Sequence, residues 1–98
     1  MVVAENEKEI MGYFLAKIEK APIYITPKRI GVIYDAFVKE KYRRKGIGEN
    51  LFKVVLDWFK KNKIKHIEVT ADYRNKQAIQ FLKKLNFKPY RLKLRRDI

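Results

Sequence analysis

The sequence feature that most constrains this chain is a short glycine-containing run at residues 43–49, set between a strand-like and a helix-like segment. Residues 30–38 before it are mostly apolar and strand-like, and residues 47–63 after it repeat apolar side chains at helical spacing. Gly46 and Gly48 allow backbone N–H groups to approach a ligand closely. A helix N-terminus adds unpaired donors and a positive dipole end. The run therefore predicts a loop that binds phosphate or pyrophosphate.

The same glycines also have a purely structural interpretation. Gly46 would then be a turn residue and Gly48 a close-packing residue, because short glycine spacings occur by chance. The run is not a nucleotide-binding P-loop, since it lacks the Gly-Lys-Ser/Thr ending, and no third glycine completes a dinucleotide fingerprint. The strand before it and the helix after it favour the binding interpretation.

Composition indicates one small domain, residues 1–98, with a single core. The chain has no cysteine, no apolar run long enough to span a membrane and no signal-peptide pattern, so we expect a cytoplasmic protein. Its net charge of +13, from 24 Lys and Arg against 11 Asp and Glu, should attract polyanions such as polyphosphate cofactors or nucleic acid. Surface lysines that merely solvate the protein explain the charge equally well.

Apolar periodicity and turn residues predict seven elements in the order strand, strand, strand, helix, strand, helix, strand. Two prolines mark residues 19–29 as a loop, with a short extended piece at residues 23–25. Strict alternation in the third strand places Asp35 on the same side as Ile33 and Phe37. The predicted strands are residues 2–4, 10–18, 30–38, 64–71 and 90–96, and the predicted helices are residues 47–63 and 74–85.

A second motif lies in the later helix, where Asn75, Ala78, Leu82 and Leu85 share one face. The apolar members are expected in the core. Asn75 is either the N-terminal cap of this helix or a ligand-binding residue. Asn86 follows as a predicted left-handed stop.

The two motifs in this order resemble the GCN5-related N-acetyltransferase (GNAT) superfamily. Residues 38–48 are similar to its acetyl-CoA-binding motif, and residues 75–87 are similar to its later helix and the strand that follows. The similarity covers roughly residues 2–90. It implies an α/β fold with a mixed, mainly antiparallel sheet and helices on its faces. Relative to the family, the chain begins at the first hairpin, so the usual N-terminal strand and two helices are missing.

The resemblance implies transfer of an acetyl group from acetyl-CoA to a primary amine by direct attack, without a covalent enzyme intermediate. In the family, amides of the glycine loop hold the cofactor pyrophosphate. The strand before the loop parts from its neighbour and pairs with the pantetheine arm, and a residue matching Asn75 hydrogen-bonds that arm. The implied cofactor-binding residues are Phe37, Val38, Lys39, Arg43, Arg44, Lys45, Gly46, Ile47, Gly48, Glu49 and Asn75.

One departure concerns the chemistry. The family often has a tyrosine at the position of Leu82, where it protonates the leaving thiolate, and leucine cannot donate a proton. Water, Tyr73 or Tyr34 would have to serve instead. Asp35 and Glu68 are the candidate bases for the acceptor amine, although each could equally be an ordinary solvated or salt-bridged carboxylate. His66 alone makes a poor metal ligand set, so no metal is expected.

Two rival functions remain open from the sequence. A non-catalytic acyl-CoA-binding subunit is favoured by Leu82 and the short N-terminus, and a nucleic-acid-binding module by the net charge. We expect a homodimer, because the absent helices should leave apolar sheet surface uncovered. The identity of the amine acceptor is not readable from the sequence.

Overall fold

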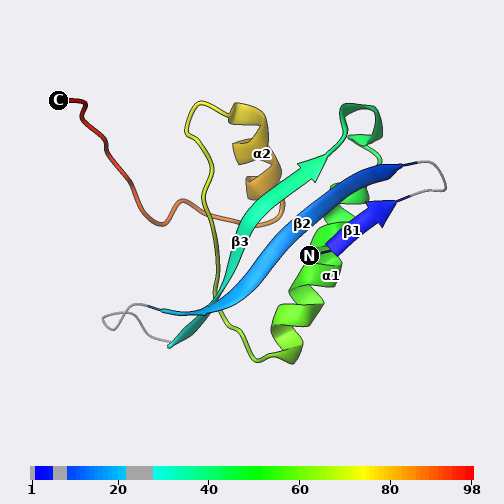
Figure 1. Cartoon of the computed structure of the whole chain (residues 1–98), viewed down its shortest axis with the longest axis horizontal. Coiled ribbons are helices and arrows are strands. Elements are labelled where there is room, and N and C mark those ends of the chain that lie inside the picture. Colours follow the sequence, from blue (N-terminus) through cyan, green and yellow to red (C-terminus); the bar gives the residue numbers. More distant parts are fainter. Residues whose placement is uncertain (1, 6–8, 22–27) are drawn as a thin grey trace.

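The computed structural model describes residues 2–5, 9–21 and 28–98, which form one four-stranded sheet and two α-helices (Figure 1). The strands are β1 (Val2–Glu5), β2 (Ile10–Lys20), β3 (Arg29–Val38) and β4 (Ile67–Val69), in the spatial order β1-β2-β3-β4. The first three are antiparallel, whereas β4 runs parallel to β3. This mixed, mainly antiparallel sheet confirms the predicted fold class. The predicted extended piece at residues 23–25 lies outside the described residues.

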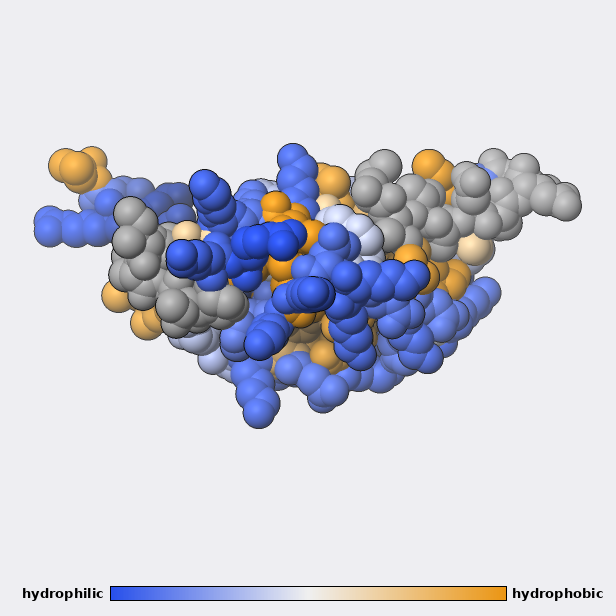
Figure 2. All heavy atoms as spheres, turned by 90° about the horizontal axis from the view of Figure 1, so that it is seen from below, coloured by the Kyte–Doolittle hydropathy of each residue, from blue (hydrophilic) through white to orange (hydrophobic). Residues whose placement is uncertain are grey.

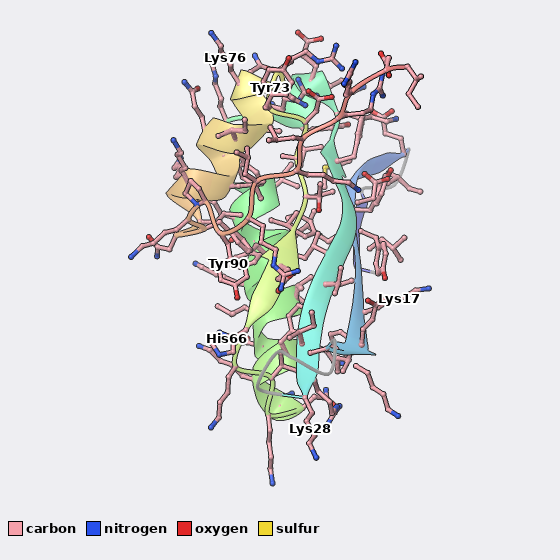
Figure 3. The ribbon with its side chains drawn as sticks, turned by 90° about the vertical axis from the view of Figure 1, so that its left-hand side faces the viewer. Lys17, Lys28, His66, Tyr73, Lys76 and Tyr90 are labelled. Carbon is pink, nitrogen blue, oxygen red and sulfur yellow. The ribbon has the colours of Figure 1, made fainter. Side chains whose placement is uncertain are left out.

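The helices are α1 (Ile47–Lys61) and α2 (Lys76–Lys84), and a short 3-10 helix, η1 (Glu40–Tyr42), precedes α1. Both α-helices lie on the same side of β2 and β3 (Figure 3). No helix of the described residues covers the opposite face, which we call the helix-free face of the sheet. No helix within residues 2–5, 9–21 and 28–98 has both the length and the apolar character needed to cross a membrane.

The core lies between α1 and the sheet. Phe14 of β2 and Val55 and Phe59 of α1 are completely buried. Gly31 of β3 makes this packing close, because a Cβ at that position would lie 2.6 Å from the Phe59 ring. The buried cluster consists of Phe14, Ile33, Leu51, Phe52, Val55, Phe59 and Ile64.

The apolar stripe of α1 is rotated from the one that the spacing predicted. Helical spacing puts Val54 and Trp58 on the predicted apolar stripe, but they are 54% and 41% exposed. Phe52 and Phe59, which the spacing puts at the margin of that stripe, lie in the core, because their larger rings fill the space between helix and sheet.

Both α-helices and β4 are shorter than the periodicity predicted, whereas β1, β2 and β3 each extend one or two residues further. Helix α1 ends at Lys61, after which Lys63 adopts a left-handed conformation with φ 60°. Strand β4 contains three residues rather than the eight of the predicted segment 64–71. Asn86 has φ 71°, which confirms the left-handed stop after α2.

The predicted edge strand at residues 90–96 is wrong. Residues 87–98 have no regular secondary structure, and Tyr90, Leu92 and Leu94 are each more than 70% exposed. Alternation of apolar and basic residues suits a strand, but a strand forms only where a neighbour accepts its hydrogen bonds. In the described part of the chain no strand pairs with this segment.

Candidate functional site

Strand β3 pairs differently along its two halves. Its first half, residues 30–33, runs beside β2 and includes Gly31–Ile33, which pair with Ile67–Val69 of β4. Its second half, residues 34–38, pairs with β2 alone, because the β4 ladder ends at Val69. We call these the paired half and the open half of β3. The parting of the two strands that the family resemblance implied is therefore present in this structure.

A β-bulge at Tyr34 separates the two halves. Leu15 of β2 pairs with Asp35, whereas the next residue, Ala16, pairs with Ile33, so Tyr34 has no partner in the register. A bulge of one residue reverses the side to which the following residues point. Asp35 therefore does not share a face with buried Ile33, as strict alternation predicted; it is exposed.

The bulge also decides which backbone groups face the edge of β3 that β4 no longer pairs with beyond Val69. We call the space beside this edge the opening. Before it, the Gly31 N–H donates toward β4, to the His66 carbonyl at 2.9 Å. After it, the Lys39 N–H donates toward β2, to the Met11 carbonyl at 2.8 Å. Backbone groups of an antiparallel strand alternate between its two sides, so those of Ala36 and Val38 face the opening. Of the three residues implied to pair with the pantetheine arm, Val38 directs its backbone to the opening, whereas Phe37 and Lys39 direct theirs to β2.

The glycine loop, residues 43–49, connects the open half of β3 to α1. Its two glycines have different roles. Gly46 is the N-cap of α1 with φ 79°, a conformation that disfavours other residues, and no atom lies within 4 Å of where its Cβ would be. Gly48 is buried, and a Cβ there would lie 2.7 Å from the Phe81 ring of α2. The structural interpretation, a turn glycine and a packing glycine, is therefore correct, and it leaves the backbone above Gly46 accessible.

The first turn of α1 has unpaired backbone donors. The first bond of the helix is donated by the Asn50 N–H to the Gly46 carbonyl at 3.0 Å. No side chain caps this end, and no acceptor within the described residues takes the N–H groups of Ile47, Gly48 or Glu49. Three donors at a positive helix end, below open space, match the requirements of a bound phosphate group.

Basic residues around the loop fall into two sets. The first set, Lys39 and Lys41, pairs with Glu9. Glu9 accepts hydrogen bonds from the Lys39 ammonium and the Tyr42 hydroxyl, each at 2.7 Å, and it also contacts the Lys41 ammonium. The hydrogen bond from Lys39, followed by those from Lys41 and Tyr42, lowers the pKa of Glu9 to about 2. This network fixes η1 to the start of β2, and sequence analysis did not identify Glu9 because it lies 30 residues or more from these partners.

The second set, Arg43, Arg44 and Lys45, is exposed and directly precedes Gly46. Arg43 Nε donates to the Val38 carbonyl at 2.9 Å, on the open side of β3. The Lys45 ammonium lies 5.9 Å from the centre of the Tyr42 ring. No carboxylate within the described residues pairs with any of these three side chains, so their charges are available to an anion at the α1 N-terminus.

Helix α2 forms a further boundary of the opening. The Asn75 side chain caps this helix, with its Oδ1 accepting from the Ala78 N–H at 3.1 Å. The capping interpretation is thus correct, and the Asn75 amide nitrogen keeps its two donor hydrogens. Lys84 of α2 pairs with Glu49 of α1 at 2.9 Å and lowers the pKa of Glu49. That pair holds α2 against the first turn of α1.

The strongest carboxylate candidate for proton transfer is Asp35. The Tyr13 hydroxyl donates to Asp35 Oδ2 at 2.7 Å, and this bond raises the pKa of Tyr13. Tyr13 alternates with buried Phe14 along β2, so both interacting side chains lie on the helix-free face. The Tyr13 ring also approaches Phe37, with centroids 6.0 Å apart. Sequence analysis missed Tyr13, although the hairpin register that pairs it with Phe37 would have identified it.

Glu68 occupies a different position from Asp35. It is half-buried in β4 and pairs in register with Val32, in the paired half of β3. Asp35 is three residues further along β3, roughly 10 Å at the usual rise of a strand. The structure thus does not bring the two candidate bases together. His66 is exposed, and the part of the chain that the structure describes contains no cluster of metal-ligating side chains.

The candidate proton donors are unequally placed. Leu82 lies half-buried in α2 and has no group that ionises. Tyr34 at the bulge is 52% exposed, and the Lys17 ammonium lies 5.6 Å from its ring centre. Tyr73 is 82% exposed and lies beside Lys76 at the upper end of the molecule (Figure 3). Of the candidate proton donors, Tyr34 is therefore the phenol that directly precedes Asp35 and lies at the start of the open half of β3.

Comparison with known proteins gives a consistent result. The sequence model described as the acetyltransferase (GNAT) family matches residues 1–87. An uncharacterized N-acetyltransferase of Methanocaldococcus jannaschii is 26% identical, over 78% of this chain and 38% of that protein. The chain therefore spans well under half the length of this curated relative.

Solved structures share the fold. A putative acetyl transferase from Pyrococcus furiosus superimposes with a TM-score of 0.84 at 26% identity, covering 98% of this chain and 63% of that one. An aminoglycoside acetyltransferase from an uncultured soil metagenomic sample superimposes with a TM-score of 0.79 at 21% identity, with the same two coverages. The chain corresponds to a little under two thirds of each of these structures.

Proposed function

Since the chain belongs to the acetyltransferase (GNAT) family, we propose that it transfers an acetyl group from acetyl-CoA to a primary amine by direct attack. The observation that carries the proposal is the junction of the open half of β3 with the α1 N-terminus. An unpaired strand edge there adjoins three unpaired amides and three exposed cations. An extended amide-containing arm that ends in a diphosphate has complementary groups for both parts.

The residues that would hold the cofactor follow from this geometry. Amides of Ile47, Gly48 and Glu49 would bind the pyrophosphate, with Arg44 and Lys45 neutralising its charge. Val38 and Ala36 would pair with the amides of the pantetheine arm, and Arg43 would have to release the Val38 carbonyl for that purpose. The Asn75 amide nitrogen would donate to the same arm.

The acceptor amine would approach from the helix-free face. An ammonium must lose a proton before it attacks the thioester carbon, and Asp35 is the exposed carboxylate on the helix-free face of the open half of β3. Tyr13 orients that carboxylate through its hydroxyl. When the C–S bond breaks, the thiolate takes a proton from water or from Tyr34, because Leu82 has none to give. The aminoglycoside acetyltransferase among the structural neighbours acts on a class of amines, which supports an amine acceptor here.

Isothermal titration with acetyl-CoA tests the cofactor site. We expect saturable binding that the double variant Arg44→Ala/Lys45→Ala weakens about tenfold through lost phosphate contacts. The matched control is Lys60→Ala/Lys61→Ala, which removes two cations at the opposite end of the same helix and should bind normally. Equal weakening by both variants would indicate a net-charge effect rather than a site.

A non-catalytic acyl-CoA-binding subunit is the second candidate, and the apolar Leu82 favours it. Release of thiol from acetyl-CoA in the presence of a panel of amines separates the two functions. Thiol release that depends on both amine and Asp35 supports the enzyme. Saturable acetyl-CoA binding without thiol release for any amine supports the subunit.

We also propose that the chain pairs with a second copy through the outer face of α1, which leaves the helix-free face open to the acceptor. Val54 and Trp58 expose apolar side chains there, 54% and 41% accessible. Sedimentation at micromolar concentration should show a dimer that Trp58→Ser weakens. A monomer under these conditions would contradict the pairing and leave the acetyl-CoA site unaffected.

A further inference from the structure

The C-terminal segment, residues 88–98, is the largest feature that the proposed function does not use. It leaves α2 and extends away from the body of the molecule to the C-terminus (Figure 1). Figure 2 shows this segment projecting at the left as mostly hydrophilic residues. No backbone hydrogen bond within the described residues involves it. The segment is an extended chain whose N–H groups can donate hydrogen bonds to a partner and whose C=O groups can accept them.

Its side chains alternate strictly over six residues. Tyr90, Leu92 and Leu94 are 71%, 83% and 82% exposed, although large apolar side chains gain free energy when buried. The residues between them, Arg91, Lys93 and Arg95, are cations. In an extended chain these two sets point to opposite sides, one apolar and one basic.

The charges of the segment are largely unbalanced. Arg95 pairs with Asp97 at 3.1 Å. Arg91 lies 5.3 Å from the ring centre of Tyr90, and neither Arg91 nor Lys93 has a carboxylate partner among the described residues. A second copy of the chain would bring another net charge of +13 to this surface. Charge complementarity therefore favours an acidic occupant over self-association.

From these features we infer that residues 90–96 bind an acidic polypeptide, with the two extended segments pairing as β-strands. Cross-strand neighbours stabilise a sheet when opposite charges face each other and apolar side chains face each other. The complementary strand is thus one that alternates acidic and apolar residues. Backbone pairing supplies affinity, and the alternation supplies register and specificity.

A nucleic acid would use only part of this surface. Phosphates could pair with Arg91, Lys93 and Arg95, but they would not pair with the backbone or cover Leu92 and Leu94. A polypeptide strand uses all three features. If the proposed acetyl transfer is correct, on which this extension rests, the acceptor is an amine on such an acidic polypeptide.

The test uses fluorescence anisotropy with a labelled peptide of alternating Glu and Val that contains one Lys. The control peptide has the same composition with its Glu and Val residues grouped in blocks. We expect the alternating peptide to bind at least about fivefold more tightly than the block peptide, because only alternation places charges and apolar groups on matching sides. Equal affinities would overturn strand pairing.

Three variants of the full chain, two charge reversals and one loss of apolar side chains, locate the binding site. Arg91→Glu/Lys93→Glu/Arg95→Glu should weaken the alternating peptide by about tenfold or more. Lys20→Glu/Lys28→Glu/Lys65→Glu makes the same change in net charge at exposed positions elsewhere, and it should have a much smaller effect. Leu92→Ser/Leu94→Ser should weaken the peptide with the charge unchanged. Equal effects of the two charge reversals would overturn the assignment to residues 90–96.

Three further results would also overturn the inference. These are tighter binding of a single-stranded oligonucleotide than of the peptide, slow amide exchange of residues 90–96 in the isolated protein, and loss of peptide binding at concentrations where the protein self-associates. Titration of the same variants with acetyl-CoA keeps the two proposals apart. The tail variants should retain acetyl-CoA binding, so failure of the peptide does not count against acetyl transfer.

Discussion

The two halves of β3 show how one strand serves both the core and the site. In the paired half, Ile30 and Ile33 are 7% and 3% exposed, and the backbone bonds on both edges. In the open half, Tyr34 and Phe37 are 52% and 38% exposed, and no strand among the described residues pairs with one of its edges. A single bulge at Tyr34 produces the change. Buried packing is therefore concentrated in the paired half of β3, and the proposed acetyl-transfer site lies along the open half.

Truncation of the core that packs on the paired half of β3 should have the largest effect on stability. Phe59→Ala removes a completely buried ring that packs against Gly31. We expect the free energy of unfolding to fall by about 3–5 kcal/mol, measured by chemical denaturation. The matched change in the open half of β3, Phe37→Ala, should lower the free energy of unfolding by about 1 kcal/mol or less. Similar losses for both variants would contradict the division of β3.

Removal of the Asp35 carboxylate, in the open half of β3, should abolish most of the acetyl transfer. We expect Asp35→Asn to lower the rate of acetyl transfer roughly 100-fold or more, with acetyl-CoA binding unchanged. Glu68→Gln, in the strand that pairs below the bulge, should alter the rate by less than about threefold. Steady-state kinetics with a fixed amine measures both. A greater loss for Glu68→Gln would place the base in the paired half.

Tyr13 should have a smaller, indirect effect. Tyr13→Phe removes the hydroxyl that holds Asp35 but keeps the ring contact with Phe37. We expect kcat to fall several-fold, while the KM for acetyl-CoA stays constant because Tyr13 lies on β2, along the edge of β3 opposite to the one proposed to bind the cofactor. Combination with Asp35→Asn should add almost nothing, since the hydroxyl acts through that carboxylate. Independent, additive losses would show that Tyr13 acts in another way.

The Glu9 network should have the smallest effect, and it appears only in acid. The folded-state pKa of Glu9 is about 2 against an ordinary value of 4.5. A lowered pKa contributes stability above pH 4.5, and that contribution is lost as the pH falls from about 4.5 to about 2. In Glu9→Gln, thermal unfolding should depend less steeply on pH across this window. An unchanged slope would mean that Lys39 and Lys41 do not hold Glu9 in solution.

Much of the fold could be predicted from the sequence because periodicity and turn residues act locally. The hairpin, the two helices, the glycine loop and Asn86 all follow from such signals. Strand β4 was predicted too long and residues 90–96 were wrongly predicted as a strand, since pairing depends on neighbours that alternation does not specify.

The site could be predicted only in part, for a similar reason. The glycine loop is continuous in sequence, so its placement beside α1 was accessible. The bulge at Tyr34 was not, because it exists only in the register of β3 against β2. That one residue moves Asp35 out of the buried face and directs Val38 rather than Phe37 to the opening. Tyr13 and Glu9 join the site from more than 20 residues away.

The central claim, that the open half of β3 and the α1 N-terminus together bind acetyl-CoA, is tested most directly by an NMR titration of backbone amides with coenzyme A. We predict saturable shifts at Ala36, Val38 and residues 46–49, with residues 30–33 nearly unchanged. Saturation with shifts confined to residues away from the opening, or no shifts at millimolar coenzyme A, would contradict the account.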